Sequence, residues 1–319
     1  MTVEKKLVYG LYGLLICFIS PLFAWQTPEV DTIVAEGRYI MGDRDSRQDA
    51  KEYALLDAKK KVMEQAGTFL RSSTTVQNYQ MSEQEIQAYT AGLIRTEILE
   101  EHFEPLGETM AAVVKIRAVV DPREVEALAR NMEQEGEKAD DISQLQGEYH
   151  QLALRLDSLK SESGGRPGSR GADYQTTFRK LHELDLLTRM AMEARRRNPD
   201  IKYLQSLIAQ YQRLHPNFKF VKGYLGIAYF KHHQPGKAIH QLKEALPTTP
   251  GKMRHGMKKL RKKTTDRMSG ETKLRFRKEA ALFHYYLARS YRQQGNRRQA
   301  LKHLQQAKRL NPNGNFRDL

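Results

Sequence analysis

Two segments of this chain align along their whole length, and this duplication restricts the fold more than any other feature. Residues 219–252 and 281–314 each cover one 34-residue period. Small and large residues recur in the same order in both copies, which predicts a closely packed helix pair in each. The matched positions are Leu225 with Leu287, Gly226 with Ala288, Tyr229 with Tyr291, Ala238 with Ala300, Leu242 with Leu304, Ala245 with Ala307 and Pro250 with Pro312.

This spacing resembles the tetratricopeptide repeat, in which small residues let paired helices approach. The resemblance implies that residues 173–319 form a superhelix of helix pairs with a concave, peptide-binding face. We expect a third, degenerate copy at 185–218, because Pro216 lies one period before the proline of the next copy. Leu204 and Tyr211 stand there in place of the expected alanines.

A basic insert, residues 253–280, separates the two clear copies. It holds eleven Lys and Arg residues against three acidic ones, with Met253, Met257 and Leu260 at helical spacing. Such a segment either lies on an anionic surface, such as phospholipid, lipopolysaccharide or wall polymer, or is a solvated loop. The predicted anionic-surface patch consists of Lys258, Lys259, Arg261, Lys262 and Lys263.

The first helix of each pair is expected to line the concave face. A guanidinium group matches a carboxylate, so a basic groove with an aromatic floor would hold an acidic peptide or a C-terminal carboxylate. The alternative is that these are ordinary solvated side chains. The predicted partner-binding residues are Arg189, Arg196, Arg197, Lys231, Arg289 and Arg292, with Phe220, Ile227 and Tyr285 on the same face.

Residues 1–24 have the pattern of an export signal. Lys5 and Lys6 precede 18 uncharged residues, Leu7–Ala24, which include a helix-breaking proline near the end. We expect cleavage after Ala24, while an uncleaved membrane anchor is the alternative. Either form predicts a protein exported to the periplasm or the cell envelope.

The single cysteine, Cys17, lies inside this apolar stretch. Lipidation requires a small residue just before the cysteine, and Ile16 is not small, so we do not expect a lipoprotein. The mature chain would then contain no cysteine, which excludes disulfides, thiol catalysis and thiolate metal sites.

Residues 30–122 have the pattern of a two-layer α/β domain with antiparallel strands. We expect a strand at 30–41, a helix from 47 to Gly67, a strand at 68–78, a short helix at 82–92 and strands at 93–103 and 110–121. Small residues recur every four positions along the first helix, which lets it lie close to a sheet. These residues are Ala50, Ala54, Ala58, Val62 and Ala66.

This region resembles the N-terminal domain of flagellar assembly protein T and related exported surface proteins. The resemblance rests on AEG at 35–37, the alanine-rich helix at 50–67, SSTTVQN at 72–78 and VKIRAVVD at 114–121. It implies a structural role in the envelope without catalysis. The rest of the chain departs from that family.

Residues 123–160 are predicted to form a helical, coiled-coil linker, and the glycine-rich residues 161–172 a flexible hinge. The linker carries an a/d seam of under three heptads, so it either self-associates or packs on its own chain. The seam residues are Ile142, Leu145, Tyr149, Leu152, Leu156 and Leu159.

Charge and motifs narrow the function further. Residues 31–128 contain 12 basic and 18 acidic residues, whereas residues 166–319 contain 35 and 10. We find no catalytic motif and expect no enzyme, cofactor, metal site or small-molecule substrate. Three clustered histidines, His232, His233 and His240, are interpreted as solvated loop residues. Export removes nucleic acid as a physiological partner.

The sequence therefore predicts an α+β multidomain protein: a small α/β domain, a helical linker and a tetratricopeptide-type array. We expect an exported, non-enzymatic scaffold of the bacterial envelope whose basic groove binds an acidic protein. An anionic wall- or membrane-binding protein and a flagellar ring accessory are the alternatives.

Overall fold

The computed structural model describes the chain between residues 30 and 316, with gaps. The described residues are 30–42, 45–73, 86, 89–90, 92–134, 147–149, 151–156, 158–159, 171–246 and 270–316. A three-stranded antiparallel sheet comes first and helices follow, which confirms the predicted α+β class. Within these ranges, no helix has the length and apolar character needed to span a bilayer.

The sheet contains β1 (Asp31–Ile40), β2 (Thr96–Leu106) and β3 (Thr109–Val120) in the order β1-β3-β2. β2 and β3 form a hairpin whose turn contains Gly107 at φ +60°, a conformation that glycine adopts without a steric penalty. Ala111 to Val114 of β3 are buried in succession, and beyond them burial alternates along the strand. The buried residues of the alternating part are Val114, Ile116, Ala118 and Val120.

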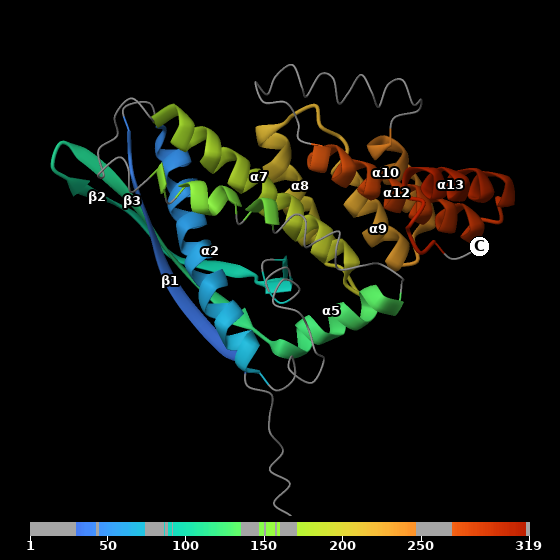
Figure 1. Ribbon diagram of the computed structural model, residues 1–319, viewed down its shortest axis with the longest axis horizontal. Helices are drawn as coiled ribbons and strands as arrows, with labels where there is room; N and C mark the ends of the chain where they lie inside the picture. The colour runs from blue at the N-terminus through green and yellow to red at the C-terminus, as the bar shows by residue number, and fades with distance from the viewer. Residues whose placement is uncertain are drawn as a thin grey trace, which may run out of the picture.

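Helix α2 (Arg47–Ser72) lies across this buried face of the sheet (Figure 1). Ser46 and Asp49 form a capping box that fixes its first turn. All five residues of the predicted small-residue stripe have no solvent exposure. The approach is closest at Gly37, where a Cβ atom would lie 2.0 Å from the carbonyl oxygen of Ala54.

The end of α2 differs from the prediction. The helix does not stop at Gly67 but continues to Ser72, so residues 68–72 of the predicted strand are helical. Leu70 is fully buried, and this packing extends the helix through the expected end. Residues 74–78 lie outside the described residues.

Side chains of α2 also occupy the outer edge of β1. The Arg38 N–H donates to Asp57 Oδ2 at 3.1 Å, and Lys61 Nζ donates to the Glu36 carbonyl at 2.7 Å. These bonds satisfy main-chain groups that an edge strand would otherwise offer to another chain.

The linker packs on its own chain where it is described. Helix α5 (Pro122–Gln134) follows the sheet, and residues 147–149 and 151–156 are helical. Tyr149 and Leu156 from the predicted seam are buried in the protein's own core. Ile142, Leu145 and the hinge up to residue 170 lie outside the described residues.

Three helix pairs follow in the part of the chain that the structure describes. They are α7 (Gly171–Arg195) with α8 (Ile201–Leu214), α9 (Lys222–Lys231) with α10 (Pro235–Ala245), and α12 (Gly270–Gln293) with α13 (Arg297–Leu310). Each pair contacts the next. The predicted degenerate copy, residues 185–218, contains the C-terminal part of α7 and all of α8. Helix α12 begins within the predicted insert, whose residues 253–269 lie outside the described residues.

Small residues bring the paired helices together as the repeat pattern predicts. A Cβ atom at Gly226 would lie 2.5 Å from Leu242 Cγ, so glycine allows α9 to approach α10. In the last pair, Ala288 stands at the matching position and is fully buried. After α13 the chain folds back, and the Phe316 ring contacts Tyr285 at 5.3 Å between centroids.

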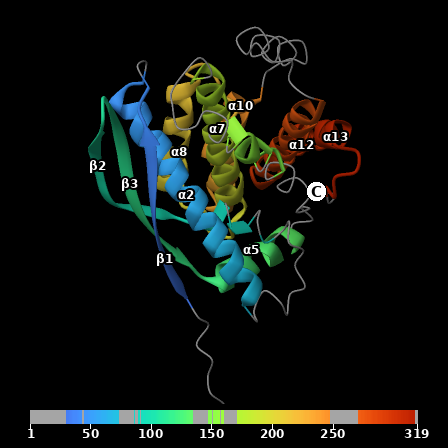
Figure 2. The same ribbon diagram turned by 60° about the vertical axis from the view of Figure 1, so that its left-hand side comes forward.

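The α/β domain and the helix pairs share one core. Residues 184–195 of α7 are buried on every side, with the sheet and α2 on one flank and the remaining helix pairs on the other (Figures 1 and 2). Tyr39 of β1, Tyr53 of α2 and Phe178 of α7 form one aromatic cluster. The acidic and basic halves are therefore packed into one structure.

Candidate functional site

A buried ionic cluster joins α7 to the α/β domain. Arg189 Nε donates to Asp185 Oδ1 at 2.8 Å, and its Nη1 donates to the Ile94 carbonyl at 2.7 Å. Lys59 Nζ of α2 donates to Asp185 Oδ2 at 3.2 Å. Arg189 is only 2% exposed, so its predicted place in an open groove is wrong. Its side chain holds two parts of the fold together.

Within this cluster, burial and neighbouring charges shift the pKa values in opposite directions. Burial lowers the pKa of Lys59, while the carboxylate of Asp185 opposes that shift. Burial alone would raise the pKa of Asp185, but Arg189 and Lys59 hold it well below its usual range. Asp185 is therefore the anion that the two buried basic side chains share.

A second set of ion pairs links the start of β2 to the loop after α7. Arg95 contacts Glu193 at 3.2 Å and Asp200 at 3.1 Å. Arg196 contacts both Glu193 and Glu124 at 3.1 Å. The charge of Arg196 is therefore already paired within the chain.

The remaining predicted cations meet at one edge of the array, where the first helices of the three pairs end. Lys231 Nζ donates to the carbonyls of Arg195 and Arg196 at 2.9 and 3.2 Å, which connects α9 to α7. The Arg289 guanidinium lies 4.6 Å from the ring centroid of Phe230, which connects α12 to α9. We call Arg197, Lys231, Arg289 and Arg292 the basic edge.

The members of the basic edge are not equally available. Arg197 and Arg292 are exposed, and no hydrogen bond or ion pair joins either to another described side chain. Arg289 is half-buried and also lies against the rings of Tyr285 and Tyr286. Lys231 already bonds to two carbonyls. The exposed arginines are thus the cations most open to a partner.

The three residues predicted to form the floor of the groove do not lie together in the structure. Ile227 is fully buried and Tyr285 nearly so, and the ring of Tyr285 supports Arg289. Phe220 lies just before the start of α9, between Phe276 and Phe283, at the opposite end from Lys231. Tyr285 therefore contacts the basic edge through Arg289.

The other candidates from the sequence are the basic patch of the insert and the clustered histidines. The patch of Lys258, Lys259, Arg261, Lys262 and Lys263 lies outside the described residues. His232 contacts the Pro199 carbonyl at 2.7 Å, and His240 lies 4.0 Å from Glu244. Across the described ranges, no three His, Cys, Asp or Glu side chains group as metal ligands would.

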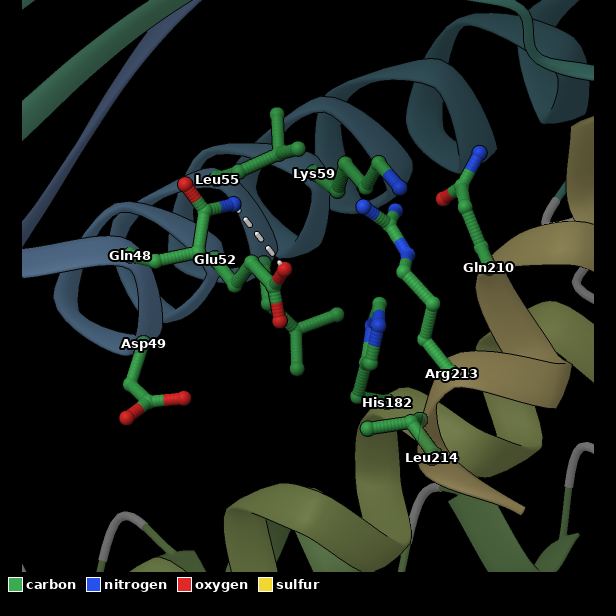
Figure 3. Close-up of a pocket in the computed structure, with 10 residues that line it drawn as sticks. Gln48, Asp49, Glu52, Leu55, Lys59, His182, Gln210, Arg213 and Leu214 are labelled. Atoms are coloured by element: carbon green, nitrogen blue, oxygen red, sulfur yellow. Dashed lines mark hydrogen bonds between the residues drawn. The ribbon is translucent and has the colours of Figure 1, made fainter. Parts of the chain in front are cut away.

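A cavity that the sequence did not predict lies between α2, α7 and α8 (Figure 3). Its volume is about 250 Å³, and its wall includes Glu52 and Lys59 of α2, His182 of α7 and Arg213 of α8. These residues come from three separate stretches of the chain, so no local motif could have indicated them. Burial and the nearby Lys59 lower the pKa of His182, which favours its neutral form.

Comparison with known families gives one match. Residues 281–313 match the tetratricopeptide repeat. This segment covers the second half of α12 and all of α13, the last helix pair. Comparisons with curated proteins and with solved structures gave no match. The repeat indicates a scaffold for protein–protein interaction. The resemblance of residues 30–122 to flagellar assembly protein T has no support here and stays a prediction.

Proposed function

We propose that the protein is an exported, non-enzymatic scaffold of the bacterial envelope, and that its basic edge binds an acidic segment of a partner protein. The observation that carries the proposal is the contact between three successive first helices at this edge. Lys231 bonds to the end of α7, and Arg289 stacks on Phe230 of α9. One continuous surface therefore collects cations from all three helix pairs.

The chemistry of this edge favours a carboxylate-rich partner. Arg197 and Arg292 are exposed, and their planar guanidinium groups can each donate two hydrogen bonds to one carboxylate. Arg289 is held in place by three aromatic rings, so little side-chain freedom is lost when it binds. Cations also suit the last turn of a helix, because they interact favourably with the helix dipole.

Affinity capture from crosslinked envelopes tests this function. The variant Arg197→Glu with Arg292→Glu reverses two exposed charges without removing a described contact. Lys302→Glu with Arg309→Glu, two exposed residues of α13, is the matched control. We expect the first variant to lose one specific partner and the control to retain it. Equal retention by both variants would exclude the basic edge as the binding surface.

Export is tested separately, because it depends on residues 1–24 and not on the array. Fractionation should place the full chain in the periplasm or envelope, and removal of these residues should leave it in the cytoplasm. Retention of the full chain in the cytoplasm would contradict export.

The anionic-surface alternative depends on the insert, and the structure defines how to test it. Arg275 is buried in α12 and pairs with Glu148, so a deletion reaching residue 278 would remove this contact together with part of α12. A deletion confined to residues 253–269 avoids this. Release of that variant from isolated envelopes, with capture of the protein partner unchanged, would favour surface binding by the insert.

A further inference from the structure

The cavity between α2, α7 and α8 lies where the α/β domain meets the first helix pair, and the proposed function does not use it. The cavity has a volume of about 250 Å³, enough for a small ligand, and some of its lining side chains, Arg213 among them, are exposed to solvent. Leu55, Leu56 and Leu214 supply part of the wall.

Cations gather on one side of the cavity. Figure 3 shows that Lys59 and Arg213 point toward one another, with His182 beside them. Lys59 Nζ uses one of its three N–H donors on Asp185, and its side chain is only 10% exposed. No described residue forms an ion pair with Arg213. This side therefore offers several N–H donors and excess positive charge to a carboxylate.

The cavity wall also carries an anion, Glu52 of α2. Glu52 accepts one hydrogen bond from Gln48 at 3.1 Å and has no described ion-pair partner. Asp49 also lines the cavity, but its carboxylate serves the capping box of α2. Glu52 is therefore the acid available to a cationic group. Glu52 would repel a ligand that carries only a negative charge. Lys59 and Arg213 would repel a ligand that carries only a positive charge.

We propose that this cavity binds a free α-amino acid with a small apolar side chain. The ligand carboxylate accepts hydrogen bonds from Lys59 and Arg213, its ammonium group donates to Glu52, and its side chain lies against the leucines. Both charges of the ligand are thereby matched, which neither a monoanion nor a monocation achieves. The bound amino acid connects α2 to α8 and so stabilises the junction between the α/β domain and the array.

Calorimetric titration of the full chain tests the site with four probes. L-leucine and L-alanine carry both charges, 4-methylpentanoate lacks the ammonium group, and isoamylamine lacks the carboxylate. We expect one or both amino acids to bind at least tenfold more tightly than the two single-charge analogues. Absence of amino-acid binding up to about 10 mM would overturn the proposal and leave a water-filled cavity.

Two variants distinguish recognition from a general loss of folding. Glu52→Gln should weaken amino-acid binding at least tenfold while improving the relative affinity for 4-methylpentanoate. Arg213→Gln should weaken both carboxylate ligands and spare isoamylamine. The controls are Glu64→Gln on α2 and Lys202→Gln on α8, exposed residues away from the cavity wall. Equal affinities in all four variants would contradict this site.

Discussion

Arg189 and Arg197 lie close together in sequence, yet the structure gives them opposite surroundings. Arg189 is packed between α7 and the α/β domain, where Asp185 and the Ile94 carbonyl accept its hydrogen bonds. Arg197 follows the end of α7 and is exposed. Arginine-rich sequence therefore serves two purposes here: the buried cations hold the fold together, and the exposed cations are available for binding.

Removal of Arg189 should have the largest effect. Arg189→Ala leaves Asp185 with only Lys59 as a buried partner, and loss of one member of a buried ionic cluster costs about 3–5 kcal/mol. Arg197→Ala should change the free energy of unfolding by less than about 0.5 kcal/mol. Urea unfolding measures both. Similar losses for the two variants would remove the distinction between buried and exposed arginines.

The close contacts at Gly37 and at Gly226 should respond differently to an added methyl group. Gly37→Ala places a Cβ atom against main-chain atoms of Ala54 and Ala58, which cannot move aside, and overpacking of this kind costs about 1–3 kcal/mol. Gly226→Ala meets mainly the Leu242 side chain, and the last helix pair has alanine at that position. We expect a smaller loss for Gly226→Ala in thermal or urea unfolding. The reverse order would contradict the packing of α2 on the sheet.

The last helix pair should carry an acid-sensitive contact between two histidines. His284 Nδ1 and His303 Nδ1 lie 3.0 Å apart, so one ring donates and the other accepts. Burial, with His303 adding to it, lowers the pKa of His284 to about 4, and burial with nearby Lys302 lowers the pKa of His303 to about 4. The contribution of this pair is complete above the unfolded value of about 6.5 and declines as the pH falls toward 4.

His303→Gln tests this contact. The variant should lose less stability than the parent between pH 6.5 and 4, because one titrating group, worth at most about 1.4 kcal/mol per pH unit, is gone. His240→Gln, at a side chain that is 70% exposed, is the control. Identical profiles for His303→Gln and the parent would exclude the histidine pair as the source of acid sensitivity.

Periodic features of the sequence predicted much of the fold. Periodic patterns predicted which face of each element is buried, and those faces are buried in the structure. The patterns are the alanine stripe of α2, the alternating residues of β3 and the small residues of the repeats. Periodicity is local, so it does not identify the element that covers the face. For this reason it could not show that α7 has the α/β domain on one flank and helices on the other.

The candidate site was harder to predict for the same reason. Repeat register placed Arg189 and Arg292 on one face, but burial of Arg189 depends on Asp185, Lys59 and the start of β2, which are distant in sequence. The cavity combines residues of α2, α7 and α8, whose proximity arises only in the folded chain. Helix α2 also continued through Gly67, because buried Leu70 outweighed the weak helix preference of glycine.

The most direct test of the division between buried and exposed arginines uses an acidic peptide. Fluorescence anisotropy of a fluorescein-labelled ten-residue glutamate peptide should report binding to the full chain. We predict that Arg197→Glu with Arg292→Glu raises Kd at least tenfold, about 1.4 kcal/mol, with the urea midpoint unchanged. Lys302→Glu with Arg309→Glu should change Kd less than about twofold. Equal weakening by the two double variants would show that net charge alone attracts the peptide, and would contradict a specific basic edge.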